Sequence, residues 1–190
     1  MANLTVTRFD IPGPALITPK RHGDDRGWFT QTWSASDWQE VGLPEIHWVQ
    51  DNEAFSAAAG TLRGMHFQAP PHAQDKLLRC IHGEIYDAIV DIRKGSPTYG
   101  KSLGVHLTGK GGEQLLVPAG FAHGYQTLSA DTLVAYKVSS PYAPQAEGGL
   151  VWNDADAAID WPNLQNVITA ERDATWPGLA DLDSPFTYSA

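Results

Sequence analysis

Short segments in which hydrophobic and polar residues alternate recur along the chain, and glycine (18 residues) and proline (13 residues) fall between them. Segments rich in Val, Ile, Thr, Tyr and Trp that are separated by turn residues are typical of antiparallel strands. The pattern predicts strands at Ala15–Thr18, Gly27–Trp33, His47–Ser56, Thr61–Phe67, Leu77–Ile81, Glu84–Asp91, Ser102–Thr108, Glu113–Val117, Tyr125–Leu128, Leu133–Val138 and Leu150–Trp152.

Helical patterns are few and short. One helix is expected at Ala35–Val41, where Ser36 and Gln39 have the spacing of a capping box. A second helical turn is expected after Thr169, with Glu171 near its positive end. His82 and Gly83 predict a tight hairpin turn between two strands. Many strands with almost no crossover helices favour a mainly β fold, a jelly roll whose mouth can hold a ligand.

Composition restricts the class of protein further. Nothing in residues 1–190 reads as a linker, so a single domain is expected. A net charge of −9 with 13 Lys and Arg residues argues against an extended nucleic-acid surface. The first residues resemble no secretory signal, and no apolar run reaches the roughly 18 residues of a membrane span. A cytoplasmic protein is therefore expected, with its one cysteine, Cys80, buried in a strand.

Polar residues gather in three segments, 60–68, 74–76 and 118–124. In a regular strand Arg63 and His66 would lie on opposite faces, unless Gly64 forms a bulge that re-aims the histidine. The spacing Pro-x-Gly-x-x-His that ends at His123 resembles the second motif of the cupin superfamily. Metal-binding cupins carry His-x-His and then a glutamate in their first motif, whereas this chain has His66-Phe-Gln68 followed by His72, Gln74 and Lys76. A lysine beside a divalent ion costs several kcal/mol. We therefore predict a pocket that holds no metal and no other cofactor.

Eight blocks of sequence, in order from about residue 20 to residue 173, resemble the dTDP-4-dehydrorhamnose 3,5-epimerase family. They are Asp24-Asp-Arg26-Gly, Val49-Gln50-Asp-Asn52, Leu62-Arg63-Gly-Met-His66-Phe-Gln68, Gln74-Asp-Lys76-Leu, Tyr86-Asp87-Ala-Ile-Val-Asp91-Ile-Arg93, Ser96-Pro-Thr98-Tyr-Gly100, Pro118-Ala-Gly-Phe-Ala-His123-Gly and Trp152-Asn-Asp154. The resemblance implies a cupin-type jelly-roll barrel, a homodimer with shared strands, and a dTDP-linked 4-keto-6-deoxy sugar as substrate.

The resemblance also assigns catalytic roles. His66 matches the catalytic base, Asp173 the carboxylate that orients it, and Tyr136 the proton donor on the opposite face. A base that removes a proton beside a ketone needs a pKa near neutrality and one fixed tautomer, and a carboxylate partner supplies both. Lys76 suits stabilisation of the enolate oxygen. His123 is expected to pair with Asp87 inside the barrel and to donate to the substrate.

Further positions match substrate contacts of the family. They are Arg26, Gln50, Asn52, Arg63, Glu147 and Arg172, together with Tyr142, which matches the aromatic residue that stacks on thymine. The planar fork of arginine suits diphosphate oxygens. Gln31 stands where the family usually has a substrate-contacting glutamate, and Arg172 stands where lysine is common, so the exact sugar and nucleotide stay open.

These residues favour a cofactor-independent isomerase that inverts C3, C5 or both in rhamnose-like deoxysugar biosynthesis. A keto-isomerase of a related sugar nucleotide would also need a histidine base. A sugar-nucleotide-binding protein without catalysis is a third hypothesis. A metal-dependent oxygenase is disfavoured, because the glutamate ligand is missing.

Overall fold

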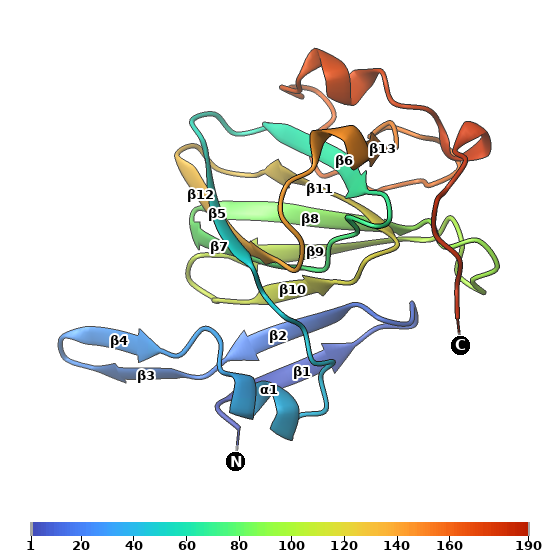
Figure 1. The fold of residues 1–190 in the computed structure, drawn as a ribbon. Coiled ribbons are helices and arrows are strands. Elements are labelled where there is room, and N and C mark those ends of the chain that lie inside the picture. The colour runs from blue at the N-terminus through green and yellow to red at the C-terminus, as the bar shows by residue number, and fades with distance from the viewer. Residues whose placement is uncertain (1, 190) are drawn as a thin grey trace.

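The computed structural model describes residues 2–189, which form two antiparallel sheets and a separate hairpin (Figure 1). The larger sheet has the strand order β1-β2-β10-β7-β12-β5, the smaller sheet has the order β13-β6-β11-β8-β9, and β3 pairs with β4. The strands are β1 (Leu4–Arg8), β2 (Ala15–Pro19), β3 (Arg21–Asp24), β4 (Gly27–Thr30), β5 (Gln50–Ser56), β6 (Leu62–Gln68), β7 (Lys76–His82), β8 (Glu84–Asp91), β9 (Ser102–Thr108), β10 (Gln114–Val117), β11 (Phe121–Thr127), β12 (Thr132–Val138) and β13 (Glu147–Gly149). The predicted mainly β fold is confirmed.

A hydrophobic core lies between the two large sheets. It includes Leu78 from β7, Ile85 and Ile89 from β8, Leu115 from β10, and Val134 from β12, all of them buried. Their alternation with residues that face outward is the period-2 pattern of a strand. Burying one face of each sheet against the other closes the barrel around this core.

The segment that follows β13 covers the outer face of the smaller sheet, as the red part of the chain above β6 and β13 in Figure 1 shows. Leu150, Trp161 and Phe186 pack there against strand residues such as Met65 and Val90. Two 3-10 helices occur in this segment, η2 (Glu171–Ala174) and η3 (Leu179–Asp181), and a third, η1 (Pro144–Ala146), precedes β13. The helical turn expected after Thr169 is therefore confirmed as η2, and it lies beside β6.

The helix α1 (Ala35–Glu40) packs Trp38 against Ile17 and Leu77 of the larger sheet. The predicted Ser36–Gln39 capping box is wrong. The N-cap is Ser34, whose hydroxyl accepts a hydrogen bond from the Asp37 backbone N–H at 3.5 Å. Ser36 lies inside the helix and its hydroxyl contacts that of Ser34. No helix among residues 2–189 is long and apolar enough to cross a membrane.

The turn at Gly83 is present, with φ +83°, but it does not join a hairpin. β7 pairs with β10 and β12 in the larger sheet, whereas β8 pairs with β9 and β11 in the smaller one. The predicted hairpin is therefore wrong, and the chain crosses here from one sheet to the other.

Some strand boundaries also differ from those predicted. The strand expected at Tyr125–Leu128 is β11, which begins four residues earlier, at Phe121. All seven residues of β11 are buried, so the strand lacks the alternation on which the prediction relied. The strand expected at Leu150–Trp152 is replaced by β13. Leu150 still exchanges backbone hydrogen bonds with Met65, but regular pairing ends at Gly149. The segments Gly27–Trp33 and His47–Ser56 are strands only at 27–30 and 50–56.

A β-bulge in β6 is centred on Gly64. His123 of β11 lies opposite His66, and Tyr125 lies opposite Arg63, so the one residue between them on β11 faces two residues, Gly64 and Met65, on β6. Gly64 has φ +130°, a conformation that side chains other than hydrogen rarely allow. The extra residue brings Arg63 and His66 to the same face, as the bulge hypothesis requires.

Candidate functional site

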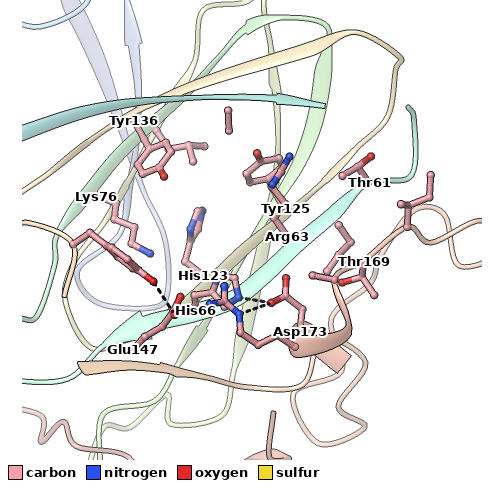
Figure 2. Close-up of a pocket in the computed structure, with 17 residues that line it drawn as sticks. Thr61, Arg63, His66, Lys76, His123, Tyr125, Tyr136, Glu147, Thr169 and Asp173 are labelled. Carbon is pink, nitrogen blue, oxygen red and sulfur yellow. Dashed lines mark hydrogen bonds and ion pairs between the residues drawn. The ribbon is translucent and has the colours of Figure 1, made fainter. Parts of the chain in front are cut away.

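A cavity of about 540 Å³ opens between the two sheets, and its lining contains most of the predicted site residues. A smaller cavity of about 300 Å³ shares His66, Lys76, Tyr136, Tyr142 and Glu147 with it and adds Gln50 and Asn52. Figure 2 shows the larger cavity, with Lys76 and Tyr136 on one side and Asp173 and Thr169 on the other. The larger cavity is lined by Ala54, Thr61, Leu62, Arg63, His66, Lys76, Leu78, His123, Tyr125, Tyr136, Tyr142, Glu147, Ile168, Thr169, Ala170, Arg172 and Asp173.

His66 of β6 and Asp173 of η2 form a tight pair at the centre of the lining. The distance from His66 Nε2 to Asp173 Oδ1 is 2.7 Å, and Asp173 is 3% exposed. The second carboxylate oxygen accepts a hydrogen bond of 3.1 Å from the Gly64 backbone N–H. The bulge therefore supports both members of the pair: it aims the histidine and it holds the carboxylate.

The pair prepares His66 to act as a base. Burial lowers the pKa of His66, and the charge of Asp173 opposes that shift in part. A neutral imidazole donates from Nε2 to the carboxylate, which leaves a lone pair on Nδ1. No residue described in the structure hydrogen-bonds Nδ1. Trp176 packs edge-on against the imidazole, with the two ring centroids 6.3 Å apart. The histidine is thus fixed in tautomer and orientation.

Lys76 begins β7 and lines both cavities. Burial lowers the pKa of Lys76 to about 8, although the negative charges of Asp87 and Glu147 act in the opposite direction. The ammonium group is therefore still mostly protonated at neutral pH. A positive charge held in a partly dry cavity can stabilise an oxyanion strongly.

Tyr136 of β12 stands on the wall formed by the larger sheet, whereas His66 belongs to the smaller sheet (Figure 2). Burial raises the pKa of Tyr136, with Arg63 opposing the shift, so the phenol keeps its proton at neutral pH. The cavity thus has a proton acceptor on one wall and a proton donor on the other.

The predicted pair of His123 and Asp87 is confirmed. Both side chains are buried, and His123 Nε2 lies 3.0 Å and 3.2 Å from the two carboxylate oxygens of Asp87. His123 comes from β11 and Asp87 from the adjacent β8. The ring lines the floor of the cavity beside His66.

The polar end of the cavity is built from Tyr142, Glu147 and Arg172. The Tyr142 hydroxyl donates to Glu147 Oε2 at 3.2 Å, and Arg172 Nη1 donates to the same oxygen at 2.7 Å. In the adjoining cavity, Gln50 Nε2 donates to Asn52 Oδ1 at 2.6 Å. Seven of the nine predicted binding residues therefore line the two cavities, namely Gln50, Asn52, Arg63, His123, Tyr142, Glu147 and Arg172.

The other two, Arg26 and Gln31, line neither of these two cavities. Arg26 lies at the tip of the β3–β4 hairpin, its side chain is 90% exposed, and it pairs with Asp24. Gln31 donates to Asp37 near the start of α1. Figure 1 shows the hairpin projecting away from the barrel. A substrate contact by these two residues therefore stays a prediction that requires a second chain.

Three polar residues of the lining were not predicted from the sequence: Thr61, Tyr125 and Thr169. Tyr125 follows His123 by two residues, and strand alternation would have placed both on one face. The structure also bears on metal binding: no three His, Cys, Asp or Glu side chains within residues 2–189 are grouped to hold an ion. The absence of a cofactor stays a prediction.

Comparisons with known proteins agree on one family. The family model described as dTDP-4-dehydrorhamnose 3,5-epimerase matches residues 8–181. A dTDP-4-dehydrorhamnose 3,5-epimerase of Sinorhizobium fredii is 45% identical over 173 residues, which are 91% of this chain and 88% of the relative.

Two solved structures are similar along nearly their whole length. The dTDP-4-dehydrorhamnose 3,5-epimerase of Bacillus anthracis, with TDP and PPi bound, has a TM-score of 0.89 and 42% identity, and the match covers 92% of this chain and 99% of that one. The dTDP-6-deoxy-D-glucose-3,5-epimerase of Legionella pneumophila, in complex with dTDP-4-keto-L-rhamnose, has a TM-score of 0.93 and 37% identity, covering 98% and 100%.

Proposed function

This chain belongs to the dTDP-4-dehydrorhamnose 3,5-epimerase family, and from that premise we propose that it inverts C3 and C5 of a dTDP-linked 4-keto-6-deoxyhexose. It is an isomerase of deoxysugar biosynthesis, and its fold is the cupin-type jelly roll predicted from the sequence. The observation that carries the proposed mechanism is the His66–Asp173 pair facing Tyr136 across the cavity, with Lys76 beside them.

The reaction begins with proton removal from a carbon next to the C4 ketone. His66 Nδ1 takes the proton, and the electron pair moves into an enolate whose oxygen becomes negatively charged. Asp173 stabilises the imidazolium that forms, because its carboxylate already accepts the hydrogen bond from Nε2.

Lys76 stabilises the enolate oxygen. Removal of one preorganised donor to an oxyanion typically costs about 3 to 4 kcal/mol. Tyr136 then returns a proton to the same carbon from the opposite face, and the configuration of that carbon is inverted. The donor must be a protonated phenol, and the raised pKa of Tyr136 keeps it so.

The nucleotide is bound by the polar end of the cavity and by the arginines. Arg63 and Arg172 contact the diphosphate, which matches their planar, charged forks. The ring of Tyr142 stacks on the nucleotide base, and the hydrogen bond from its hydroxyl to Glu147 holds the ring in that position. Gln50 and Asn52 supply further polar contacts from the adjoining cavity.

The functional unit is a homodimer with shared strands, in which residues 1–190 of each chain act as one domain in the cytoplasm. The dimer is supported by the position of Arg26 and Gln31, which the single chain leaves outside its own cavity. A partner's hairpin would bring Arg26 to the substrate, and Gln31 directly follows that hairpin in the sequence.

The test is proton NMR of dTDP-4-keto-6-deoxyglucose in D2O with the enzyme. The wild-type protein should exchange the C3 and C5 protons and yield the inverted sugar, which separates epimerisation from keto-isomerisation. His66→Ala should abolish exchange, whereas His47→Ala, which removes an exposed histidine outside every cavity described above, should not. Binding without exchange by the wild-type protein would exclude this reaction, and exchange by His66→Ala would exclude that base.

A further inference from the structure

Gln68, the last residue of β6, is a buried glutamine to which the mechanism above gives no role. It follows His66 by two residues, at the position where metal-binding cupins carry the second histidine of their first motif. The residue is 4% exposed and borders the smaller cavity. A buried amide destabilises a fold unless its polar atoms are paired, so the partners of Gln68 indicate what the side chain does.

The amide group of Gln68 is bonded to the backbone on both sides of Tyr142. Its Nε2 donates to the carbonyl oxygens of His72 at 2.8 Å and of Pro141 at 3.2 Å, and its Oε1 accepts from the Ala143 N–H at 2.8 Å. Pro141 and Ala143 are the chain neighbours of Tyr142. Both amide hydrogens are used in these bonds, so the side chain has no donor left for a ligand. Gln68 therefore acts on the loop rather than on a bound molecule.

Tyr142 is a residue that needs such support. It is 56% exposed and belongs to no helix or strand. Its hydroxyl donates to Glu147 at 3.2 Å, and Glu147 is the residue that pairs with Gln68 where β13 meets β6. Earlier in the same loop, Gln74 Nε2 donates to the Ser140 carbonyl oxygen at 2.6 Å. The backbone and the ring of Tyr142 are thus both tied to the end of β6.

We propose that Gln68 is a positioning residue for the nucleotide, because it holds the Tyr142 ring in place to stack on the base before the ligand arrives. This inference rests on the proposed function, in which Tyr142 binds the base. A loop that is already ordered loses less freedom when the ligand binds, and the affinity is higher for that reason. Since Gln68 touches no reacting carbon, its loss should raise KM and change kcat little.

Calorimetric titration with dTDP tests the proposal. Gln68→Met keeps the length of the side chain and makes none of the three hydrogen bonds, and it should weaken dTDP binding about fivefold. Tyr142→Ala should weaken it about tenfold, the usual order for one base–aromatic stack. The double variant should bind no more weakly than Tyr142→Ala alone, because a residue that acts through Tyr142 then has nothing to position. With the sugar substrate, Gln68→Met should raise KM about fivefold at a nearly unchanged kcat.

Gln126→Met is the matched control. Gln126 is 0% exposed, and its amide also holds backbone, because it donates to the Asn163 carbonyl oxygen at 2.7 Å and accepts from the Asn163 N–H at 3.1 Å. It lines neither of the two cavities. Both glutamine variants should lower the Tm, whereas only Gln68→Met should weaken dTDP binding. A merely structural role for Gln68 would give the two variants the same affinity for dTDP.

Three results would overturn the proposal: additive losses in the double variant, an equal loss of affinity in Gln126→Met, or a loss confined to kcat. If Gln68→Met does not fold, amide hydrogen exchange of the unliganded wild-type protein decides. The Ala143 N–H should then exchange as slowly as the amides of β6, and fast exchange would exclude a loop held in advance. Wild-type protein that fails to bind dTDP would overturn both proposals. Binding of dTDP without epimerisation would count against the proposed function alone, because the dTDP titrations would still support the role of Gln68.

Discussion

At the residue scale, Lys76 links the pH dependence of the reaction to one side chain. Burial lowers its pKa to about 8, so the ammonium is present below that pH and is lost as the pH rises through it. The enolate loses its stabilising charge in the same range. We therefore expect kcat/KM for C3 and C5 exchange to fall above about pH 8, because kcat/KM reports the pKa values of the unliganded enzyme.

The variant Lys76→Arg tests the assignment, because a guanidinium stays charged far above this range. We expect a lower kcat/KM from the altered geometry but no decline of kcat/KM between about pH 7 and about pH 9.5, measured by NMR exchange in buffered D2O. Loss of the proton from Tyr136 should not cause a decline in this pH range, since the pKa of Tyr136 is raised above the ordinary phenol value. If the alkaline decline persists in Lys76→Arg, a different group causes it.

The four residues proposed for catalysis were all predicted from the sequence and all line the cavity, whereas other residues of the lining were not predicted. His66 and Asp173 are 107 positions apart, so no local pattern could pair them, and only the family resemblance brought them together. Tyr125 and Thr169 were missed because one tyrosine in a strand and one threonine in a loop are ordinary residues. Their unpartnered hydroxyl groups become visible only when the cavity is formed.

At the element scale, the bulge at Gly64 is the feature on which the site geometry depends. A Cβ atom on Gly64 would lie 2.5 Å from Gly124 Cα and 2.8 Å from the His123 carbonyl oxygen, and φ is +130°. We expect Gly64→Ala to lower the free energy of unfolding by about 3 kcal/mol, by overpacking and backbone strain together. Because the bulge also aims His66 and binds Asp173, exchange activity should fall even where the variant is folded.

Gly95→Ala is the matched control, and urea titration of both variants measures the free energies of unfolding. Gly95 has φ +81°, but a Cβ there would meet nothing within 4 Å, so only backbone strain remains. That strain should cost about 1 kcal/mol and leave activity intact. If both variants lost the same free energy of unfolding, the close approach of β6 to β11 would not explain why residue 64 is a glycine.

The elements that the sequence predicted best are those with a plain core pattern. β8 and β9 have the predicted bounds, whereas β1 and β3, which contain no fully buried residue, were missed. The false hairpin at Gly83 followed from the usual tendency of consecutive strands to pair. Pairing partners in a jelly roll depend on long-range packing, which turn residues do not report.

At the scale of the whole molecule, the β3–β4 hairpin has large side chains that its own chain does not cover. Trp28 is 59% exposed and Phe29 is 71% exposed, and both lie beside Arg26 on an arm that projects from the barrel (Figure 1). Large exposed aromatic side chains close together are typical of surfaces that contact another protein. These features support the proposed dimer, in which each hairpin reaches the cavity of the other chain.

Exchange between chains tests this arrangement directly. His66→Ala removes the base and Arg26→Ala removes the arm's cation, so each variant alone should be nearly inactive. If Arg26 acts on the partner's cavity, mixed dimers of the two variants contain one site with both residues intact. After denaturation and refolding of an equal mixture, half of the dimers are mixed and one of their two sites works, so about a quarter of wild-type activity should return.

The same mixture excludes the alternative. If Arg26 reached the cavity of its own chain, every site would lack one of the two residues, and no activity would return whatever the proportion of mixed dimers. Refolding each variant separately and then combining the samples at low temperature provides the control, since chains that have not exchanged should stay inactive. Recovered activity that grows with chain exchange would therefore establish both the dimer and the crossing of its arms, because a monomer cannot complement another monomer.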